Sequence, residues 1–156
     1  MPKILEADPM RCDGCRLCEA ACSVVNFGAA NPEKSRIRII TGEGGLEIPV
    51  FCRHCTSPPC REACPRDAVY IDEASRRVMI DPFRCVGCGM CVAACPFGAL
   101  GFDTDKGRPF KCNLCGGTPA CLQVCEKGAI FYVEDYNLRE HNIREAAAVV
   151  LRHHAP

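Results

Sequence analysis

The cysteines of this chain are the residues whose number and spacing point most directly to chemistry. All 16 fall into four runs of four, and none is left over. Two runs have the spacing C-x2-C-x2-C-x3-C, and the other two have the same spacing with extra residues before the third cysteine. This spacing is typical of ligands to [4Fe–4S] clusters. The runs are Cys12, Cys15, Cys18 and Cys22; Cys52, Cys55, Cys60 and Cys64; Cys85, Cys88, Cys91 and Cys95; and Cys112, Cys115, Cys121 and Cys125.

The geometry of an iron–sulfur cube explains why each run has three closely spaced cysteines and a fourth further on. Each of the four irons takes one thiolate, and three cysteines in one short loop can hold three corners of the cube. The fourth cysteine starts a segment that leaves the loop, so it ligates the other cluster of a pair. The 16 cysteines therefore predict four [4Fe–4S] clusters.

Zinc sites and disulfides are the competing interpretations of these cysteines. Zinc also binds C-x2-C pairs, and four all-cysteine zinc sites would use the same number of ligands. A zinc knuckle needs only two cysteines, whereas every run here carries a third at near-fixed spacing. A disulfide scaffold is disfavoured because residues 1–6 (MPKILE) lack the apolar region of a signal peptide. Cysteines three residues apart are also poorly placed for unstrained bridges.

Length and composition predict one compact body whose core depends on the clusters. The chain has 156 residues, only 6% aromatic residues and no tryptophan. The clusters must then form much of the core, and we expect the apoprotein to be largely unfolded. The formal net charge is +0 with cysteines counted as neutral. Each oxidised cluster with its thiolates carries about −2, which brings the loaded chain to about −8.

Few other residues suggest chemistry. His54 lies inside the second run, where it either donates a hydrogen bond to cluster sulfur or faces solvent as a loop residue. Basic residues next to ligands either raise cluster potentials or are solvated surface charges. These basic residues are Arg11, Arg53, Arg61, Arg84 and Lys111. No motif for transforming an organic substrate is present, so we expect the chain not to be an enzyme by itself.

The sequence also gives expectations about nucleic-acid binding and about the location of the protein. No basic tract suggests nucleic-acid binding. No apolar run approaches the roughly 20 residues of a membrane span, and no twin-arginine signal precedes Cys12. We therefore expect a cytoplasmic protein, whose thiols stay reduced until clusters are inserted.

Short strands and helical turns are expected to position the cysteine runs in an α+β fold. Strands are predicted after the last three runs, at 68–71, 99–102 and 129–133. One hairpin should pair 69–71 with 78–81 across the turn at 73–77, and another should join 36–40 to 46–50 and cover clusters against water. Segments between third and fourth cysteines, such as 92–94, suit a single helical turn.

The C-terminal part has a different pattern. Residues 1–136 form the predicted cluster-binding body, and 137–156 a tail with a helix from Asn137 to His153. One face of this helix is apolar, so it docks either on the chain's own surface or on another subunit.

Residues 52–65 (CRHCTSPPCREACP) and 85–99 (CVGCGMCVAACPFGA) resemble the four-cluster electron-transfer subunits of molybdenum and tungsten oxidoreductases. The resemblance extends over residues 3–133. It implies two ferredoxin-like two-cluster modules in a nested pseudo-repeat, with inserted hairpins and a C-terminal helix. Module A would combine runs 12–22 and 112–125, and module B runs 52–64 and 85–95. The residues by themselves also permit pairing of neighbouring runs.

The nested pairing implied by this resemblance assigns ligands to each cluster. Cluster 1 would be held by Cys12, Cys15, Cys18 and Cys125, and cluster 2 by Cys112, Cys115, Cys121 and Cys22. Cluster 3 would be held by Cys52, Cys55, Cys60 and Cys95, and cluster 4 by Cys85, Cys88, Cys91 and Cys64.

The same resemblance implies a role and partners. The chain would relay electrons between a catalytic subunit with a tungsten or molybdenum pterin cofactor and a second partner such as a flavin/NAD subunit. The compact segment 112–121 (CNLCGGTPAC), the short tail and residues 31–38 (NPEKSRIR) are most similar to small subunits of tungsten aldehyde oxidoreductases. Such an enzyme oxidises an aldehyde to a carboxylic acid.

Other roles stay open at this point. The chain could be a free-standing soluble polyferredoxin, or the electron-transfer subunit of a carbon monoxide dehydrogenase, hydrogenase or formate dehydrogenase. Whether further copies of the chain stack to extend the row of clusters is also open.

Overall fold

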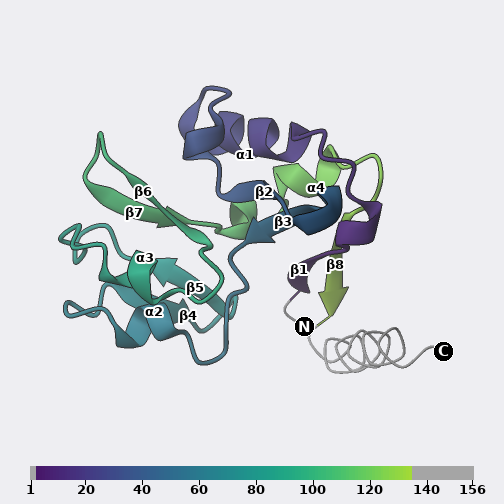
Figure 1. Cartoon of the computed structure of the whole chain (residues 1–156). Helices are drawn as coiled ribbons and strands as arrows, with labels where there is room; N and C mark the ends of the chain where they lie inside the picture. Colours follow the sequence, from purple (N-terminus) through teal and green to yellow (C-terminus); the bar gives the residue numbers. More distant parts are fainter. Residues whose placement is uncertain (1–2, 135–156) are drawn as a thin grey trace.

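The computed structural model describes residues 3–134, which form four two-stranded antiparallel sheets linked by short helices (Figure 1). The predicted tail helix at 137–153 lies outside the described residues. The strands are β1 (Lys3–Ala7), β2 (Ile37–Thr41), β3 (Glu47–Phe51), β4 (Val69–Asp72), β5 (Arg77–Ile80), β6 (Leu100–Asp103), β7 (Arg108–Lys111) and β8 (Ile130–Glu134). The α-helices are α1 (Leu17–Phe27), α2 (Pro59–Glu62), α3 (Met90–Ala94) and α4 (Ala120–Gln123). The 3-10 turns are η1 (Pro9–Arg11), η2 (Pro32–Lys34), η3 (Glu43–Gly45) and η4 (Leu114–Gly117).

Three of the sheets are local hairpins, and the fourth joins distant parts of the chain. The hairpins are β2–β3, β4–β5 and β6–β7, whereas β1 pairs with β8 in the register Leu5 to Tyr132. The predicted hairpins are both confirmed, with Ile37 opposite Phe51 and Val69 opposite Ile80. The first arm of the β2–β3 hairpin alternates between buried and exposed side chains, since Ile37 is buried and Arg38 is exposed.

Two strands were not predicted from the sequence. Strand β7 has the sequence RPFK, which contains a proline and carries little strand propensity. Strand β1 has the sequence KILEA and is held in place by its pairing with β8, more than 120 residues away in the chain. The predicted strands 99–102 and 129–133 are β6 and β8, each beginning one residue later than expected.

The helices pack in two nested pairs, the first with the last and the second with the third. Helix α1 contacts α4, and α2 contacts α3. Figure 1 shows α1 and α4 beside β2 and β3, while α2 and α3 lie beside β4 and β5. Among residues 3–134, no helix has both the length and the apolar character that a membrane crossing requires.

Helix α1 is longer than the expected single turn. It covers 11 residues and ends at Phe27, and the following Gly28 forms a left-handed C-cap with a φ of 79°. The sequence after Cys22 continues with Ser23 and Val24, whereas Pro65 and Pro96 follow the last cysteines of the second and third runs. A proline stops a helix at this position, so its absence lets α1 continue.

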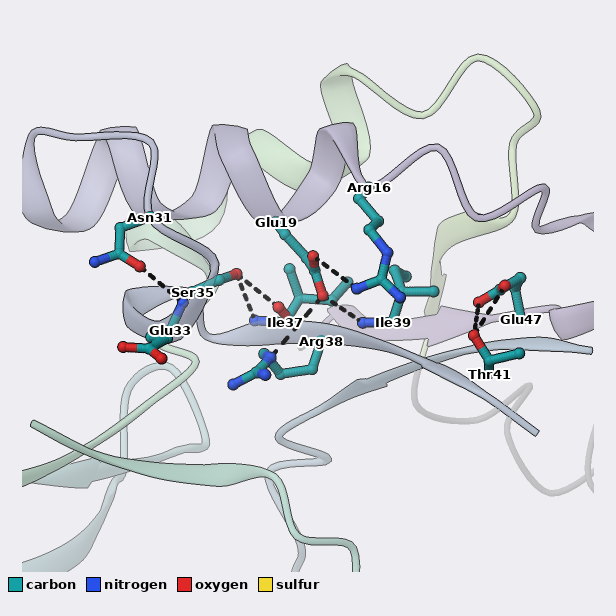
Figure 2. Close-up of polar contacts among 10 residues, drawn as sticks. All are labelled: Arg16, Glu19, Asn31, Glu33, Ser35, Ile37, Arg38, Ile39, Thr41 and Glu47. Atoms are coloured by element: carbon teal, nitrogen blue, oxygen red, sulfur yellow. Dashed lines mark hydrogen bonds and ion pairs between the residues drawn. The ribbon is translucent and has the colours of Figure 1, made fainter.

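A buried carboxylate fixes α1 onto the β2–β3 hairpin (Figure 2). Glu19 is 1% exposed, and its Oε1 accepts a hydrogen bond of 2.7 Å from the backbone N–H of Ile39. Its carboxylate also lies 3.4 Å from the Arg16 guanidinium and 3.9 Å from that of Arg38. Both arginines are about half exposed, so the hydrogen bond to the buried backbone is the stronger constraint.

Replacing Glu19 therefore gives a first prediction. Glu19→Ala leaves the buried Ile39 N–H without an acceptor and should destabilise the fold by about 2 to 3 kcal/mol. Glu19→Gln keeps an acceptor oxygen and loses only the exposed ion pairs, so it should cost about 1 kcal/mol or less. The thermal midpoint of cluster bleaching, followed by visible absorbance at one scan rate, measures both. Equal midpoints for the two variants would contradict this account of Glu19.

Candidate iron–sulfur centres

The four cysteine loops share one backbone feature at the second residue after the first cysteine. This residue has positive φ in every run: Gly14 (72°), His54 (47°), Gly87 (72°) and Leu114 (56°). In the second and fourth runs its N–H donates to the preceding thiol, from His54 to Cys52 Sγ and from Leu114 to Cys112 Sγ, both at 3.4 Å. The same left-handed turn thus presents backbone N–H groups to sulfur whether or not glycine is available.

The first cysteine group surrounds an open cavity. The cavity has about 530 Å³ of space free of protein atoms. Ile39 and Pro49 of the β2–β3 hairpin line it, as expected for a hairpin that covers a cluster. The cysteines that line it are Cys12, Cys15, Cys18 and Cys125.

Two further cavities, lined by cysteines of segment 52–95, have the same construction. One is lined by Cys52, Cys55, Cys60 and Cys95. The other is lined by Cys64, Cys85, Cys88 and Cys91. Each cavity takes three cysteines from one run and the fourth from a different run.

The remaining four cysteines lie near one another, and two of them are neighbours of the Asn26 side chain. Its Nδ2 lies 3.6 Å from Cys22 Sγ and 3.9 Å from Cys115 Sγ. Cys22, Cys112 and Cys121 are buried in the same apolar cluster. Burial raises the pKa of Cys121, and the neighbouring sulfurs of Cys112, Cys22 and Cys115 raise it further.

Burial makes several of these thiols poor acids until a metal binds. Desolvation raises the pKa of Cys18 to about 12, and those of Cys60 and Cys112 to about 11. Iron binds the thiolate, so ligation must release these protons. All 16 cysteines are free thiols, and groups of four soft sulfur donors around a cavity suit a [4Fe–4S] cluster. Within residues 3–134, no three His, Cys, Asp or Glu side chains are close enough to one another to hold a single metal ion.

Cys64 differs from these buried thiols. Although burial raises its pKa, the backbone N–H groups of Arg66, Val69 and Ala68 together hold the pKa of Cys64 below its ordinary value. The Ala68 N–H lies 3.3 Å from Cys64 Sγ. Cys22, the corresponding cysteine of the first run, receives the Arg36 N–H at 3.3 Å. These donors stabilise negative charge on sulfur, and nothing in the sequence identified Asn26 or Arg36 as neighbours of Cys22.

The solvent-facing alternative for His54 is wrong. Its Nδ1 accepts a hydrogen bond from the Val78 N–H at 3.1 Å, and its Nε2 is buried without a hydrogen-bond partner among the described residues. Burial, with the positive charges of Lys111 and Arg77, lowers the pKa of His54 to about 3. The ring is therefore neutral and carries its proton on Nε2. A hydrogen bond from this proton to cluster sulfur stays a prediction.

Comparison with known proteins agrees with these features. A family profile described as a 4Fe-4S dicluster domain matches residues 46–135, and one described as a 4Fe-4S binding domain matches residues 9–25. The chain is 40% identical over 119 residues to the polyferredoxin-like subunit of an aliphatic sulfonate oxidoreductase from Pyrococcus furiosus. The aligned region covers 76% of this chain and 69% of that protein.

Two other proteins, one compared by sequence and one by structure, are similar to this chain. Subunit beta of an NADH-dependent phenylglyoxylate dehydrogenase from Aromatoleum evansii is 34% identical over 134 residues, covering 84% of this chain. The chain spans only 30% of that protein's length. Among solved structures, a chain of the active-site complex BamBC of benzoyl coenzyme A reductase with 1,5-dienoyl-CoA has a TM-score of 0.51 and 26% identity, over 84% of this chain and 75% of that chain. The cysteine loops and these similarities together show that the chain belongs to the 4Fe-4S dicluster domain family and binds multiple [4Fe–4S] clusters.

Proposed function

We propose that this chain is the electron-relay subunit of an oxidoreductase complex and holds four [4Fe–4S] clusters in two nested pairs. The observation that carries the proposal is the grouping of the thiols, since each of three cavities combines three cysteines of one run with the fourth of another. The contacts of α1 with α4 and of α2 with α3 support the same pairing of runs. The ligand sets are Cys12, Cys15, Cys18 and Cys125; Cys112, Cys115, Cys121 and Cys22; Cys52, Cys55, Cys60 and Cys95; and Cys85, Cys88, Cys91 and Cys64.

Electrostatic effects between thiols of neighbouring groups support a single row of clusters. Cys18 of the first set raises the pKa of Cys121 in the second. Cys52 of the third set raises the pKa of Cys112 in the second. Cys91 of the fourth set raises the pKa of Cys60 in the third. The order along the row is therefore cluster 1, cluster 2, cluster 3 and cluster 4.

The two ends of this row are suited to exchange electrons with partners. Cys15 of the first set and Cys88 of the fourth are exposed, whereas Cys112 and Cys52 in the middle are buried. Charge can enter at one exposed end and leave at the other without passing through solvent. When bound, the clusters supply the one-electron chemistry, and the chain supplies ligation, spacing and electrostatics.

The partners follow from the relatives and from the sequence pattern. Relatives named as subunits of a sulfonate oxidoreductase and a phenylglyoxylate dehydrogenase support an oxidoreductase complex. Within it, the chain would connect a tungsten- or molybdenum-pterin subunit, for example one oxidising an aldehyde to a carboxylic acid, to a flavin/NAD subunit. Substrate conversion would take place on the catalytic subunit, and this chain would transform no organic substrate itself.

Metal content and association state test this proposal. After oxygen-free purification we expect about 16 iron and about 16 acid-labile sulfide per chain, from four clusters of about four iron each. We also expect the chain to elute with a large partner that contains a pterin cofactor. Zinc without sulfide would contradict the clusters. Elution only as a monomer of 17.0 kDa would instead favour a free-standing polyferredoxin.

A further inference from the structure

Lys111 is an unusual charge in this protein because it is buried. Its exposed fraction is 5%, and it is the one buried lysine or arginine among residues 3–134. Its ammonium donates to two backbone carbonyl oxygens, that of Val78 and, at 3.1 Å, that of Cys112. Within the described part of the chain, no carboxylate forms an ion pair with it. A buried ammonium normally requires an opposite charge nearby, and carbonyl dipoles alone compensate it poorly.

The two carbonyl partners place this ammonium between two cysteine groups. Cys112 belongs to the second proposed ligand set. Val78 lines the cavity of the third set, together with Cys52 and Cys60. Lys111 lies on β7 opposite Leu100 of β6, and its side chain reaches β5. The side chain therefore lies between the second and third ligand sets, at the middle of the proposed row.

We propose that Lys111 is the shared counter-ion of the two central clusters and raises their reduction potentials above those of the same clusters without this charge. The inference rests on the proposed function, since it needs clusters in the second and third ligand sets. Each added electron makes a cluster more negative, and a poorly screened positive charge beside it favours the reduced form. A cation shared by both central clusters would hold electrons in the middle of the row.

The electrostatics at the surrounding thiols agree with this position. Lys111 acts to lower the pKa of Cys55, Cys60 and Cys112, which come from both central sets, against the larger opposing effect of burial. The other basic residues beside cysteines are placed differently. Arg53 forms an ion pair with Glu6, and Arg84 lies 3.5 Å from Asp81. The charges of these two arginines are compensated by carboxylates, whereas that of Lys111 is not compensated by any carboxylate of the described residues.

Potentiometric titration of matched variants tests the inference. Lys111→Gln removes the charge and keeps a donor, Lys111→Met removes both, and Lys111→Arg keeps the charge. Lys106→Gln is the control, because Lys106 is exposed and its charge is screened. EPR-monitored reduction at low and high salt, with iron and sulfide analysis of each variant, gives the readout.

In Lys111→Gln and Lys111→Met we expect two of the four reduction steps to become about tenfold less favourable, which is about 59 mV for one electron. The shift should persist at high salt, and Lys111→Arg should keep potentials near those of the unmodified chain. If both neutral variants fail to load iron while Lys111→Arg loads fully, a positive charge is required beside the clusters, which supports the role of Lys111 as their counter-ion. If Lys111→Arg also fails, or if loaded neutral variants show no shift or the shift of Lys106→Gln, the inference is overturned. Absence of iron and sulfide from the unmodified chain would instead refute the proposed function.

Discussion

Extraction of iron and sulfide should abolish the fold of this chain. The larger apolar cluster of the core contains the thiol side chains of five cysteines, Cys18, Cys22, Cys52, Cys112 and Cys121. Helices α2, α3 and α4 are four or five residues long, and each sheet formed by residues 3–134 has only two strands. Isolated elements of this size are not stable in water. Without clusters the remaining apolar contacts cannot offset the conformational entropy of the chain.

Circular dichroism before and after anaerobic oxidation in the presence of a chelator measures this effect. We expect the helix and strand signals to collapse and the cooperative thermal transition to disappear. Chelator without oxidant serves as the control and should leave both unchanged, because the intact cube retains its iron. An apoprotein that keeps its spectrum and melts cooperatively would show that the apolar core is sufficient by itself.

The parts of the structure that were predicted from the sequence depend on local spacing. Cysteines three residues apart define a loop by themselves, so the four loops followed from the sequence. The β4–β5 hairpin was also predicted, because Val69 and Ile80 lie close in sequence on either side of a polar turn. The shared left-handed turn was not predicted, because only two of the runs have glycine there (Gly14 and Gly87), while His54 and Leu114 stand at the same place in the others.

Apart from β7 of the local β6–β7 hairpin, whose sequence RPFK contains a proline, the strands and neighbours that were missed depend on contacts between distant segments. The pairing of Leu5 with Tyr132 brings the two ends of the described chain together. Neither strand has a sequence pattern that indicates the other as its partner. The burial of Lys111 is similar, since its partner Val78 is 33 residues away. A basic residue beside a ligand looks the same in sequence whether it is exposed, like Arg61, or buried. The grouping of thiols across runs was available only through family resemblance, because residue spacing also permits pairing of neighbouring runs.

Substitution of Cys22 by serine should therefore release the fourth run from its cluster and leave the first run protected. Cys22 lies in α1 within the first run, yet its sulfur shares the Asn26 side chain with Cys115. A serine hydroxyl is a weaker iron ligand than a thiolate, so the cluster of the second ligand set should be lost or strongly weakened. We expect the loss of at most about four of about 16 iron. The released thiols would be Cys112, Cys115 and Cys121.

Anaerobic alkylation followed by peptide mass spectrometry shows which thiols become free. The matched variant Cys125→Ser should give the reciprocal result, freeing Cys12, Cys15 and Cys18 and leaving the fourth run protected, because Cys125 lines the first cavity. If Cys22→Ser freed its own run, each run would hold its own cluster. If it freed Cys52, Cys55 and Cys60, neighbouring runs would be paired. Because helix α1 contacts α4 and the thiols of the two runs meet around Asn26, we expect neither result.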